Sequence, residues 1–428
     1  MAARFGWAAG IIYGMVELNR SEPRQIAAEV VRKLQAAGFE AYFAGGCVRD
    51  QIMGNTPEDY DIATSAHPEQ VLKIFPRSKR VGAAFGVVMV RHYNRPMEVA
   101  TFRTDGVYSD GRRPDTVHFT TAEHDAQRRD FTCNGLFFDP MAEKLIDYVG
   151  GQVDINARIL RAIGEPAHRF REDHLRMMRA IRFAARLNFA IEPATWTAIV
   201  THANRLAEIS RERIGLELRK MLVAPQRHSA VEMLARSGLL QCFWPEIAAL
   251  DEVDTRLSRL AALPQKASFP LALAATVLDL IEDHTHDAQA LIGQTKALQT
   301  NLVLSSEETQ WLQWLLLNLP MMAQWRTLRL AAFKRLLAHI WSADLLALYA
   351  TERRDDELRE LTQYITELKK KPLAPDRFVD GSDLIAMGVK PGPRFKLWLE
   401  ELYDRQLEGN FIDRPSALKA AKELIHGR

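Results

Sequence analysis

Two segments near the N-terminus combine the residue types that bind phosphate groups and divalent cations. They are Gly45-Gly46-Cys47-Val48-Arg49-Asp50 and, nine residues further on, Asp59-Tyr60-Asp61. Adjacent glycines at a strand-to-helix turn let backbone N–H groups approach a phosphate, and Arg49 could add a guanidinium contact. Asp59 and Asp61 lie two apart on a predicted strand, so both carboxylates project from one face and suit Mg²⁺ that takes other ligands from substrate phosphates. Two such ions could activate an attacking hydroxyl group and neutralise a leaving pyrophosphate.

Taken singly, each segment also fits a structural glycine turn or a solvated acidic strand end. Together, GGCVRD and DYDIAT resemble the nucleotidyltransferase signature of the DNA polymerase β superfamily, in particular the family of class II tRNA nucleotidyltransferases (CCA-adding enzymes) and bacterial poly(A) polymerases. The resemblance implies a template-independent RNA nucleotidyltransferase in which Asp59 and Asp61 are the catalytic metal ligands for two Mg²⁺ ions. It implies CTP and ATP as substrates and the 3′ end of tRNA as the partner. Glu98, on a strand of the predicted hairpin that follows, is a candidate third carboxylate.

A second motif, Arg128-Arg129-Asp130-Phe131-Thr132-Cys133-Asn134, resembles the family's RRDFTxN motif. Adjacent arginines suit a triphosphate or ribose site, and Asp130 could orient one of them. The resemblance places Arg128, Arg129, Asp130 and Asn134 in nucleotide binding. Without the other motifs, a charged turn before an apolar strand would explain these residues equally well.

A third motif, Glu172-Asp173-His174-Leu175-Arg176, resembles the family's EDxxR motif, whose Asp and Arg act as a protein template for CTP and ATP. On one helix, Asp173 and Arg176 would share a face, and a carboxylate beside a guanidinium can read the edge of cytosine or adenine. An ordinary ion pair on a solvated helix is the alternative. Arg179 and Arg182 continue near that face and could bind phosphates or simply solvate it.

A fourth motif, Ser210-Arg211-Glu212-Arg213-Ile214 with Glu217 and Leu218, resembles the family's S-x-E-R-I-x-x-E-L pattern. We interpret it as a helix that begins after an N-cap at Ser210 and supports the base-reading helix. Its charges are expected to be structural rather than catalytic.

The choice among the family's activities depends on two further segments. Residues 108–115, with Asp110, Arg112 and Arg113, fill the place of the flexible loop that helps the switch from CTP to ATP, which disfavours an enzyme adding only CC. Residues 381–394 resemble the tail segment of CCA-adding enzymes, and no polybasic tail typical of the poly(A) polymerases follows. We therefore favour CCA addition, with A addition alone as the next alternative, then CC addition or poly(A) synthesis. An inactive RNA-binding protein of the same fold would have lost a metal carboxylate or the base-reading pair, and neither is lost.

The predicted elements give an α+β fold that is mostly α overall. Residues 23–38 predict a helix, 41–44 and 59–64 strands, 81–102 a hairpin with its turn at 92–96, and 117–120 and 136–148 further strands. From about residue 160 onward, apolar residues recur at the spacing of a helix. The predicted organisation is an uncertain leader (1–22), a mixed α/β nucleotidyltransferase head with a small sheet (23–157), and elongated helical neck (158–228), body (229–371) and tail (372–428) domains, of which neck and tail would bind RNA.

Charge is unevenly distributed along the 428 residues, although the formal net charge is only +2. Residues 1–157 carry 18 basic and 20 acidic side chains, residues 158–228 carry 14 and 7, and residues 229–428 carry 24 and 27. A basic central segment beside an acidic-leaning head fits an enzyme that binds both Mg²⁺ and RNA. Three cysteines without a CxxC pair, and no apolar run long enough to span a bilayer, predict a cytoplasmic protein without a membrane partner. The first 16 residues only faintly resemble a signal peptide, and Met15 is as plausible a start as Met1.

Overall fold

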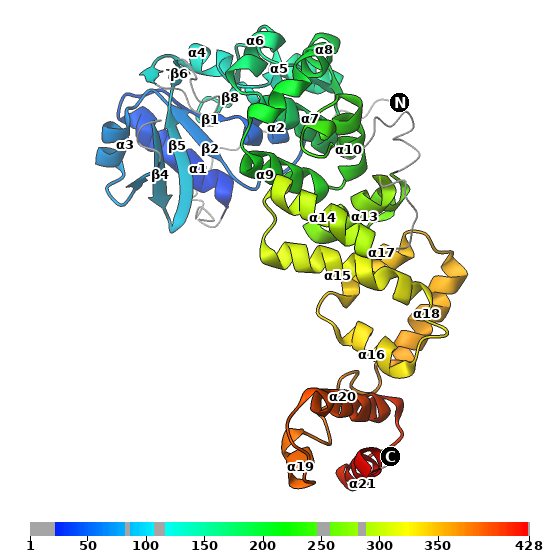
Figure 1. The fold of residues 1–428 in the computed structure, drawn as a ribbon. Coiled ribbons are helices and arrows are strands. Elements are labelled where there is room, and N and C mark those ends of the chain that lie inside the picture. The colour runs from blue at the N-terminus through cyan, green and yellow to red at the C-terminus, as the bar shows by residue number, and fades with distance from the viewer. Residues whose placement is uncertain (1–21, 82–85, 107–115, 246–256, 281–287, 427–428) are drawn as a thin grey trace, which may run out of the picture. The chain divides into compact units, whose positions relative to one another are not determined.

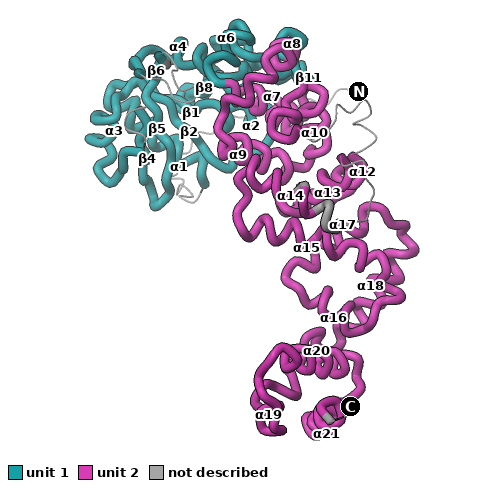
Figure 2. The backbone as a smooth tube through the Cα atoms, in the orientation of Figure 1, with its two compact units in different colours: residues 1–173, 190–195 teal, residues 174–189, 196–428 magenta. Residues whose placement is uncertain are grey.

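The computed structural model describes residues 22–81, 86–106, 116–245, 257–280 and 288–426 (Figure 1). The predicted leader, apart from its last residue, and the loop with Asp110, Arg112 and Arg113 lie outside the described residues. Two compact units are present, one of residues 1–173 and 190–195 and the other of residues 174–189 and 196–428 (Figure 2). The division into head, neck, body and tail stays a prediction.

Unit 1 is built on a seven-stranded mixed sheet with the strand order β3-β4-β5-β2-β1-β8-β9. The strands are β1 (Ala41–Ala44), β2 (Asp61–Thr64), β3 (Lys79–Arg80), β4 (Val87–His92), β5 (Arg95–Thr101), β8 (Leu136–Asp139) and β9 (Lys144–Asp147). β2 and β5 are parallel, whereas the other described neighbours pair antiparallel. A parallel pair needs a crossover connection, which α3 (Pro68–Ile74), β3 and β4 supply.

Helices cover this sheet because their apolar residues recur at helical spacing. α1 (Pro23–Ala36) begins with a proline, as the sequence predicts, and buries a stripe that includes Ile26, Val30 and Leu34. The remaining helical elements of unit 1 are α2 (Gly46–Ile52), α4 (Ala122–Gln127), η2 (Thr132–Asn134), α5 (Gly151–Ala157) and α6 (Pro166–Glu172). Two small sheets pair β6 (Arg103–Asp105) with β7 (Val117–Phe119) and β10 (Ile159–Leu160) with β11 (Ala190–Ile191).

Two local predictions for unit 1 need correction. The hairpin of β4 and β5 is confirmed, but its turn is shorter than predicted, because His92 pairs with Arg95 and only Tyr93 and Asn94 connect the strands. Both have positive φ, 46° and 59°, as in a two-residue turn whose twist matches the strands. The strand predicted over residues 59–64 begins only at Asp61, so Asp59 precedes β2 instead of sharing the strand with Asp61.

Unit 2 is helical, which confirms the predicted change in the spacing of apolar residues from that of strands to that of helices. Its helices are α7 (Leu175–Leu187), most of α8 (Pro193–His202), η3 (Ala203–Glu208), α9 (Arg211–Leu222), α10 (Arg227–Arg236), η4 (Leu240–Cys242), α12 (Ser258–Ala262), α13 (Phe269–Leu280), α14 (Ala288–Leu302), α15 (Ser306–Ala323), α16 (Leu330–Ala338), α17 (Ser342–Ala350), α18 (Asp355–Leu368), α19 (Gly381–Ala386), α20 (Pro393–Glu408) and α21 (Arg414–His426). The fold class, a mixed α/β part followed by helices, is therefore confirmed. None of the helices in the described part of the chain is long and apolar enough to cross a membrane.

Candidate active site

Three carboxylates come together at one end of the parallel strands β2 and β5. Ile62 pairs with Val99, so Asp61 and Glu98 occupy the neighbouring positions one residue earlier on each strand. Asp59, Asp61 and Glu98 line one open pocket of about 250 Å³, and all three are exposed to solvent. The structure therefore brings the candidate third carboxylate to the two predicted from the DYD motif. We call this site the acidic pocket.

The electrostatics of the acidic pocket favour a cation. Although Asp61 is open to solvent on one side, the protein atoms around it partly exclude water and raise the pKa of its carboxyl group. The negative charges of Glu98 and then Asp59 act in the same direction, while the positive charge of Arg129 opposes them. Carboxylates that repel one another gain from a divalent ion placed among them. Among the described residues, no three His, Cys, Asp or Glu side chains are arranged to hold one ion by themselves. A fitting ion is thus one that keeps water and takes substrate oxygens as ligands, which is the habit of Mg²⁺.

The glycine turn lies between β1 and α2, whose first residue is Gly46. Gly45 has φ of +71°, and its N–H donates to the carbonyl of Leu136 at 3.0 Å. A Cβ at Gly45 would lie 3.0 Å from Nη1 of Arg129, which is tighter than ordinary packing. The position therefore needs glycine for its backbone conformation and for the close approach of an arginine.

Arg49 faces the protein interior, with an exposed fraction of 2%. Its Nη1 donates to Oδ1 of Asn134 at 2.6 Å, and its Nε donates to Oδ1 of Asp50 at 2.8 Å. The predicted role was a direct phosphate contact. The observed contacts instead join the GGCVRD segment to the end of the RRDFTCN motif, two segments that sequence separates widely.

The two arginines of the RRDFTCN motif share one buried carboxylate, Asp125, which sequence reasoning missed. Nε of Arg128 donates to Oδ1 of Asp125 at 2.9 Å, and Nη2 of Arg129 donates to Oδ2 at 3.0 Å. Burial alone would raise the pKa of Asp125, but the positive charges of Arg129 and Arg128 outweigh it and lower that pKa. The spacing of three and four residues along the chain was the signal that could have identified this pairing.

Asp130, to which the sequence reading gave the orienting role, has other observed contacts. It accepts hydrogen bonds from the backbone N–H of Phe131 at 2.9 Å and from Nδ2 of Asn134 at 3.2 Å. Asn134 in turn accepts from Nη1 of Arg129 at 3.2 Å through its backbone carbonyl. Residues 128–134 therefore form one hydrogen-bonded loop beside the glycine turn, which we call the arginine loop, and Arg49 is joined to it through Asn134.

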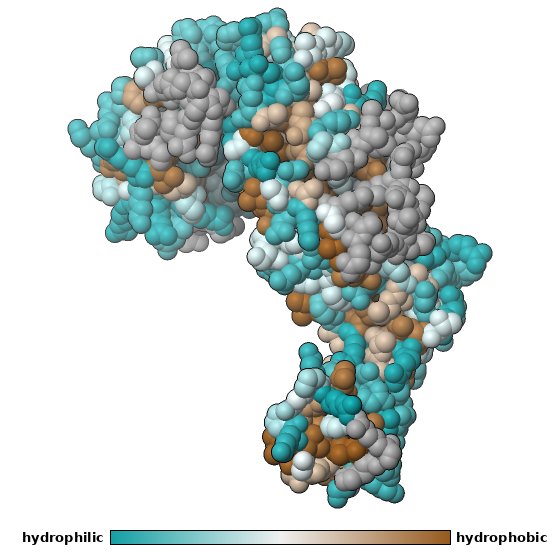
Figure 3. Space-filling view, in the orientation of Figure 1, coloured by the Kyte–Doolittle hydropathy of each residue, from teal (hydrophilic) through white to brown (hydrophobic). Residues whose placement is uncertain are grey.

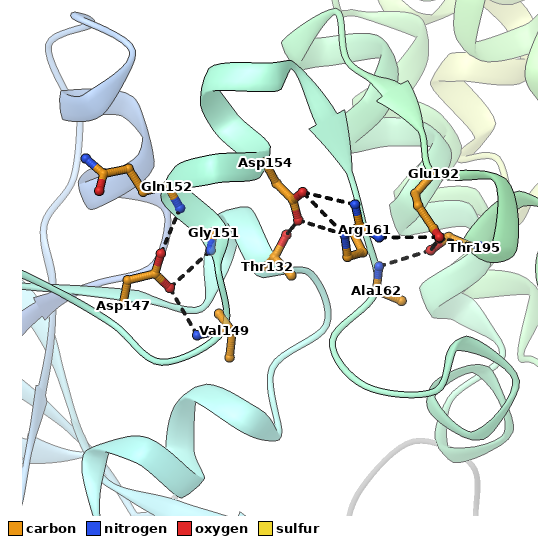
Figure 4. A network of polar contacts seen from close by, with 10 residues as sticks. All are labelled: Thr132, Asp147, Val149, Gly151, Gln152, Asp154, Arg161, Ala162, Glu192 and Thr195. Atoms are coloured by element: carbon orange, nitrogen blue, oxygen red, sulfur yellow. Dashed lines mark hydrogen bonds and ion pairs between the residues drawn. The ribbon is translucent and has the colours of Figure 1, made fainter.

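A second polar network holds this loop from behind (Figure 4). The hydroxyl of Thr132 donates to Asp154 at 2.7 Å, and Asp154 also accepts from Nε of Arg161 at 3.0 Å. Arg161 forms a further ion pair with Glu192 at 3.4 Å, and Glu192 accepts from Thr195. Gly151 lets α5 approach closely, because a Cβ there would lie only 2.2 Å from the carbonyl oxygen of Thr132. The network fixes Thr132 and with it the residues on either side of it.

The base-reading motif differs from its prediction in backbone conformation. Asp173 is not helical: α6 ends at Glu172, Asp173 has an extended backbone with φ of −151°, and α7 begins at Leu175. The predicted sharing of one helix face by Asp173 and Arg176 was therefore wrong, since that geometry needs a continuous helix. Both side chains are 9% exposed, Asp173 within unit 1 and Arg176 within unit 2.

The later arginines of α7 pack inside unit 2. Nε of Arg182 donates to Glu217 at 2.6 Å, and its guanidinium lies 4.2 Å from the centre of the Phe183 ring. Arg179 approaches the same ring at 5.4 Å. Glu217 belongs to α9, so the fourth motif supports α7 as its interpretation predicts. Ser210 occupies the N-cap position of α9, but its side chain forms no capping hydrogen bond.

Comparisons with known proteins agree with this geometry. The family model described as "Poly A polymerase head domain" matches residues 41–161, and that described as "Probable RNA and SrmB- binding site of polymerase A" matches residues 188–250. A CCA-adding enzyme of Streptococcus mutans is 35% identical over 399 residues, which cover 92% of this chain and 95% of the relative. One from Geobacillus stearothermophilus is 46% identical over 231 residues, covering 54% of this chain and 57% of the relative.

Solved structures show the same similarity. The Bacillus stearothermophilus CCA-adding enzyme in complex with CTP matches with a TM-score of 0.76 and 29% identity, covering 95% of this chain and 99% of that one. The Thermotoga maritima CCA-adding enzyme complexed with tRNA_CCA shares the fold, with a TM-score of 0.66 and 18% identity over 96% of this chain and 97% of that one.

The head-domain match covers every strand and loop that forms the acidic pocket and the arginine loop, and the class of protein is that of the nucleotidyltransferases. The similarity to the Streptococcus mutans enzyme extends over nearly the whole chain. The protein belongs to the CCA-adding enzyme family.

Proposed function

We propose that this protein adds CCA to the 3′ end of tRNA from CTP and ATP. The observation that carries the proposal is the acidic pocket, in which Asp59 and Asp61 lie exposed beside Glu98 in a chain of this family. The reaction is an in-line attack of the RNA 3′-hydroxyl on the α-phosphate of the incoming nucleotide, with pyrophosphate leaving.

Asp59 and Asp61 are the residues that would hold Mg²⁺, with Glu98 as their neighbour. When bound, Mg²⁺ lowers the pKa of an attacking hydroxyl group and offsets the charge of a leaving pyrophosphate. The chain itself supplies the triphosphate contacts: the backbone N–H of Gly46, which the turn at Gly45 positions, and the guanidinium groups of Arg128 and Arg129. Asp125 fixes both guanidinium groups before substrate arrives, so little reorganisation is needed during the reaction.

Base choice is assigned to Asp173 and Arg176 on the resemblance of EDHLR to the family's template motif. A carboxylate that accepts from an exocyclic amine and a guanidinium that donates to a ring acceptor suit cytosine and adenine, while uracil and guanine present the opposite pattern. Asp173→Ala should therefore admit UTP or GTP, with selectivity falling about 10- to 100-fold, since one good hydrogen-bonded pair contributes about 1–3 kcal/mol of discrimination. Incorporation of each of the four nucleotides into one tRNA transcript measures this, and unchanged selectivity would refute the assignment.

The tRNA partner is expected to be held by shape and phosphates rather than by sequence, because side chains cannot read the deep, narrow major groove of duplex RNA. The basic segment of residues 158–228 supplies the charge for this, so affinity for tRNA should weaken as the salt concentration rises. We place the reaction in the cytoplasm, since all three cysteines are free and Cys47 and Cys133 are buried within unit 1.

The experiment that tests the proposal uses tRNA transcripts that end before CCA, after the first C, and after CC. Each is incubated with labelled CTP, with labelled ATP and with both, and the product lengths are measured. Full CCA addition extends all three transcripts to the same end. Extension only of the transcript ending in CC would show A addition alone, arrest at CC would show CC addition, and long adenylate tails would show poly(A) synthesis.

Asp59→Ala is the negative control for this experiment and should abolish the incorporation of both nucleotides while leaving tRNA binding intact. An inactive RNA-binding protein of this fold would bind all three transcripts and extend none of them.

A further inference from the structure

A second pocket of unit 1 shares no lining residue with the acidic pocket. It lies where the C-terminal part of α1, the end of α3 and the turn between β4 and β5 meet, and its open volume is about 620 Å³. Its lining includes Lys33, Phe75, Arg77, Arg91, His92 and Tyr93, and we call it the turn pocket.

We propose that the turn pocket binds an unpaired nucleotide of RNA, with the base stacked on the Tyr93 ring and the adjacent phosphates held by Arg77 and Arg91. The inference rests on the proposed function in one respect, namely that RNA is the polymer this protein handles. The nucleotide is one outside the reacting 3′ end, since no residue of the acidic pocket takes part.

The turn pocket is a concentration of positive charge on a unit that is acidic overall. From Lys73 to Arg95 the sequence contains six Lys and Arg residues and no Asp or Glu. Lys33, Arg77 and Arg91 are all exposed, and the described residues that line the pocket include no carboxylate. The surface over α3 and β4 is accordingly mostly hydrophilic (Figure 3). Clustered cations of this kind attract a polyanion.

The aromatic side of the turn pocket is exposed yet held in place. Tyr93 is 45% exposed, and its ring centre lies 4.5 Å from that of His92, which in turn meets Phe75 edge-on at 6.1 Å. Nε2 of His92 lies 3.0 Å from Oε2 of Glu29, and the same carboxylate interacts with the hydroxyl of Tyr93. The ring therefore needs little ordering when a base stacks on it, which favours binding.

An exposed ring beside two guanidinium groups fits single-stranded RNA better than other anionic partners. Such a site resembles the stacking platforms and cationic grooves by which proteins hold unpaired strands. A duplex offers the phosphates but keeps its bases stacked inside, and an acidic peptide offers carboxylates but no planar ring. The combination of Tyr93 with Arg77 and Arg91 therefore selects an unpaired nucleotide.

The test measures binding of the full chain to a fluorescent 12-nucleotide oligoadenylate with a blocked 3′ end, and to a blunt RNA duplex of the same length. Tyr93→Asn removes the ring while keeping a residue that tolerates positive φ, and Tyr93→Phe keeps the ring. The double variant Arg77→Ala/Arg91→Ala removes the two guanidinium groups. Lys144→Ala/Arg354→Ala is its matched control, since it removes two exposed cations that do not line the pocket.

Tyr93→Asn should weaken binding of the oligoadenylate about tenfold, as loss of one stacked base does, while Tyr93→Phe, which loses only the hydroxyl contact with Glu29, should retain most of the binding. The Arg77/Arg91 variant should reduce the slope of log affinity against log salt by about 1.4, or about 0.7 for each lost phosphate contact. Duplex binding should not respond to Tyr93→Asn. The proposal would be overturned if Tyr93→Asn bound the oligoadenylate with wild-type affinity. It would also be overturned if the Lys144/Arg354 control reduced the salt slope as much as the Arg77/Arg91 variant does, or if polyglutamate at equal concentration displaced the RNA.

A tRNA transcript lacking CCA distinguishes the source of the nucleotide. Weaker tRNA binding by Tyr93→Asn assigns the nucleotide to an unpaired loop of the substrate, whereas a loss confined to the oligoadenylate assigns it to another single-stranded RNA. At saturating tRNA, Tyr93→Asn should add CTP and ATP at the wild-type rate. If the wild type adds neither nucleotide, the proposed function is wrong, while binding of the oligoadenylate still tests the proposal for the turn pocket.

Discussion

The acidic pocket and the arginine loop lie on the same unit but are prepared for substrate in opposite ways. Asp59, Asp61 and Glu98 are exposed, and their mutual repulsion helps to raise the pKa of Asp61. Arg128 and Arg129 are fixed by the buried carboxylate of Asp125. The protein therefore completes the cationic half of the site by itself and leaves the anionic half to be completed by metal and substrate. Preorganised cations and uncompensated carboxylates are both useful for transfer of a charged phosphoryl group.

The sharpest test of this contrast is Asp61→Asn. Loss of a metal ligand should lower nucleotide incorporation by about a hundredfold to a thousandfold, the order seen when a central electrostatic group is removed. The same change should raise the melting temperature of the metal-free protein slightly, because the folded state disfavours the ionised form of Asp61. Incorporation assays and thermal melts in EDTA measure the two effects. Glu58→Gln, which changes another exposed carboxyl group of the same pocket, should leave incorporation largely unchanged.

Asp125→Asn should show the opposite behaviour, with a large loss of stability. Removing one partner of a buried charge pair costs about 3–5 kcal/mol, because the remaining charges are left unpaired. The free energy of unfolding, measured by urea denaturation, should fall by that order, and the KM for CTP and ATP should rise as the two guanidinium groups lose their support. Glu123→Gln, an exposed site on the same helix, is the matched control. A variant as stable as the wild type would show that Asp125 does not hold the loop.

The difference in stability between the wild type and Asp125→Asn should also depend on pH. The pKa of Asp125 is lowered in the folded protein, so its stabilising contribution is present above the ordinary pKa of Asp, about 4, and is lost as the pH falls through the lower folded value. The two unfolding free energies should therefore run parallel above about pH 4 and converge below it. Convergence at neutral pH would contradict the assigned pairing.

The smallest effect on stability and activity is expected at Thr132, where Asp154 binds the arginine loop. Thr132→Val removes a hydroxyl that donates to the buried Asp154 at 2.7 Å, and should cost about 1–3 kcal/mol of stability. Arg161 still pairs with Asp154, so incorporation should fall only severalfold. Thr132→Ser keeps the donor and should restore both the urea midpoint and the rate. Failure of the serine variant to restore them would show that Thr132 acts through its methyl group.

The sequence predicts the acidic pocket well because its motif is local. Asp59 and Asp61 are only two residues apart, so both line the pocket although Asp59 lies just before β2, and Gly45 precedes α2 as the glycine turn requires. The class of fold follows as easily, since the change from strand to helical period near residue 160 is long and regular. Glu98 was identified only as a candidate because its position depends on a pairing between distant strands.

The contacts inside the site could not be read in the same way. Arginine is usually exposed, so the sequence alone does not show that Arg49 is buried. Its contact with Asn134 depends on how α2 packs against η2. The spacing of Asp125 to Arg128 and Arg129 indicates an ion pair, but nothing local shows that this carboxylate is buried. Asp173 looked helical because the apolar spacing continues through it, yet the backbone breaks there. Arg49 depends on a contact between distant segments, Asp125 on the burial of its helix face, and Asp173 on a backbone torsion that the side-chain pattern does not encode.

The parallel pairing of β2 with β5 has a consequence for how activity arises during folding. Asp61 and Glu98 are separated along the chain by the whole of α3, β3 and β4, and they become neighbours only when this long-range pair closes. Pairings between distant segments form late, because chain entropy must be lost before their contacts contribute. The refolding chain would thus acquire its helices, and with them most of its circular dichroism signal, before Glu98 joins Asp61 and the acidic pocket reaches its full affinity for a divalent cation. The time at which a luminescent lanthanide ion binds during refolding would then report when the sheet closes.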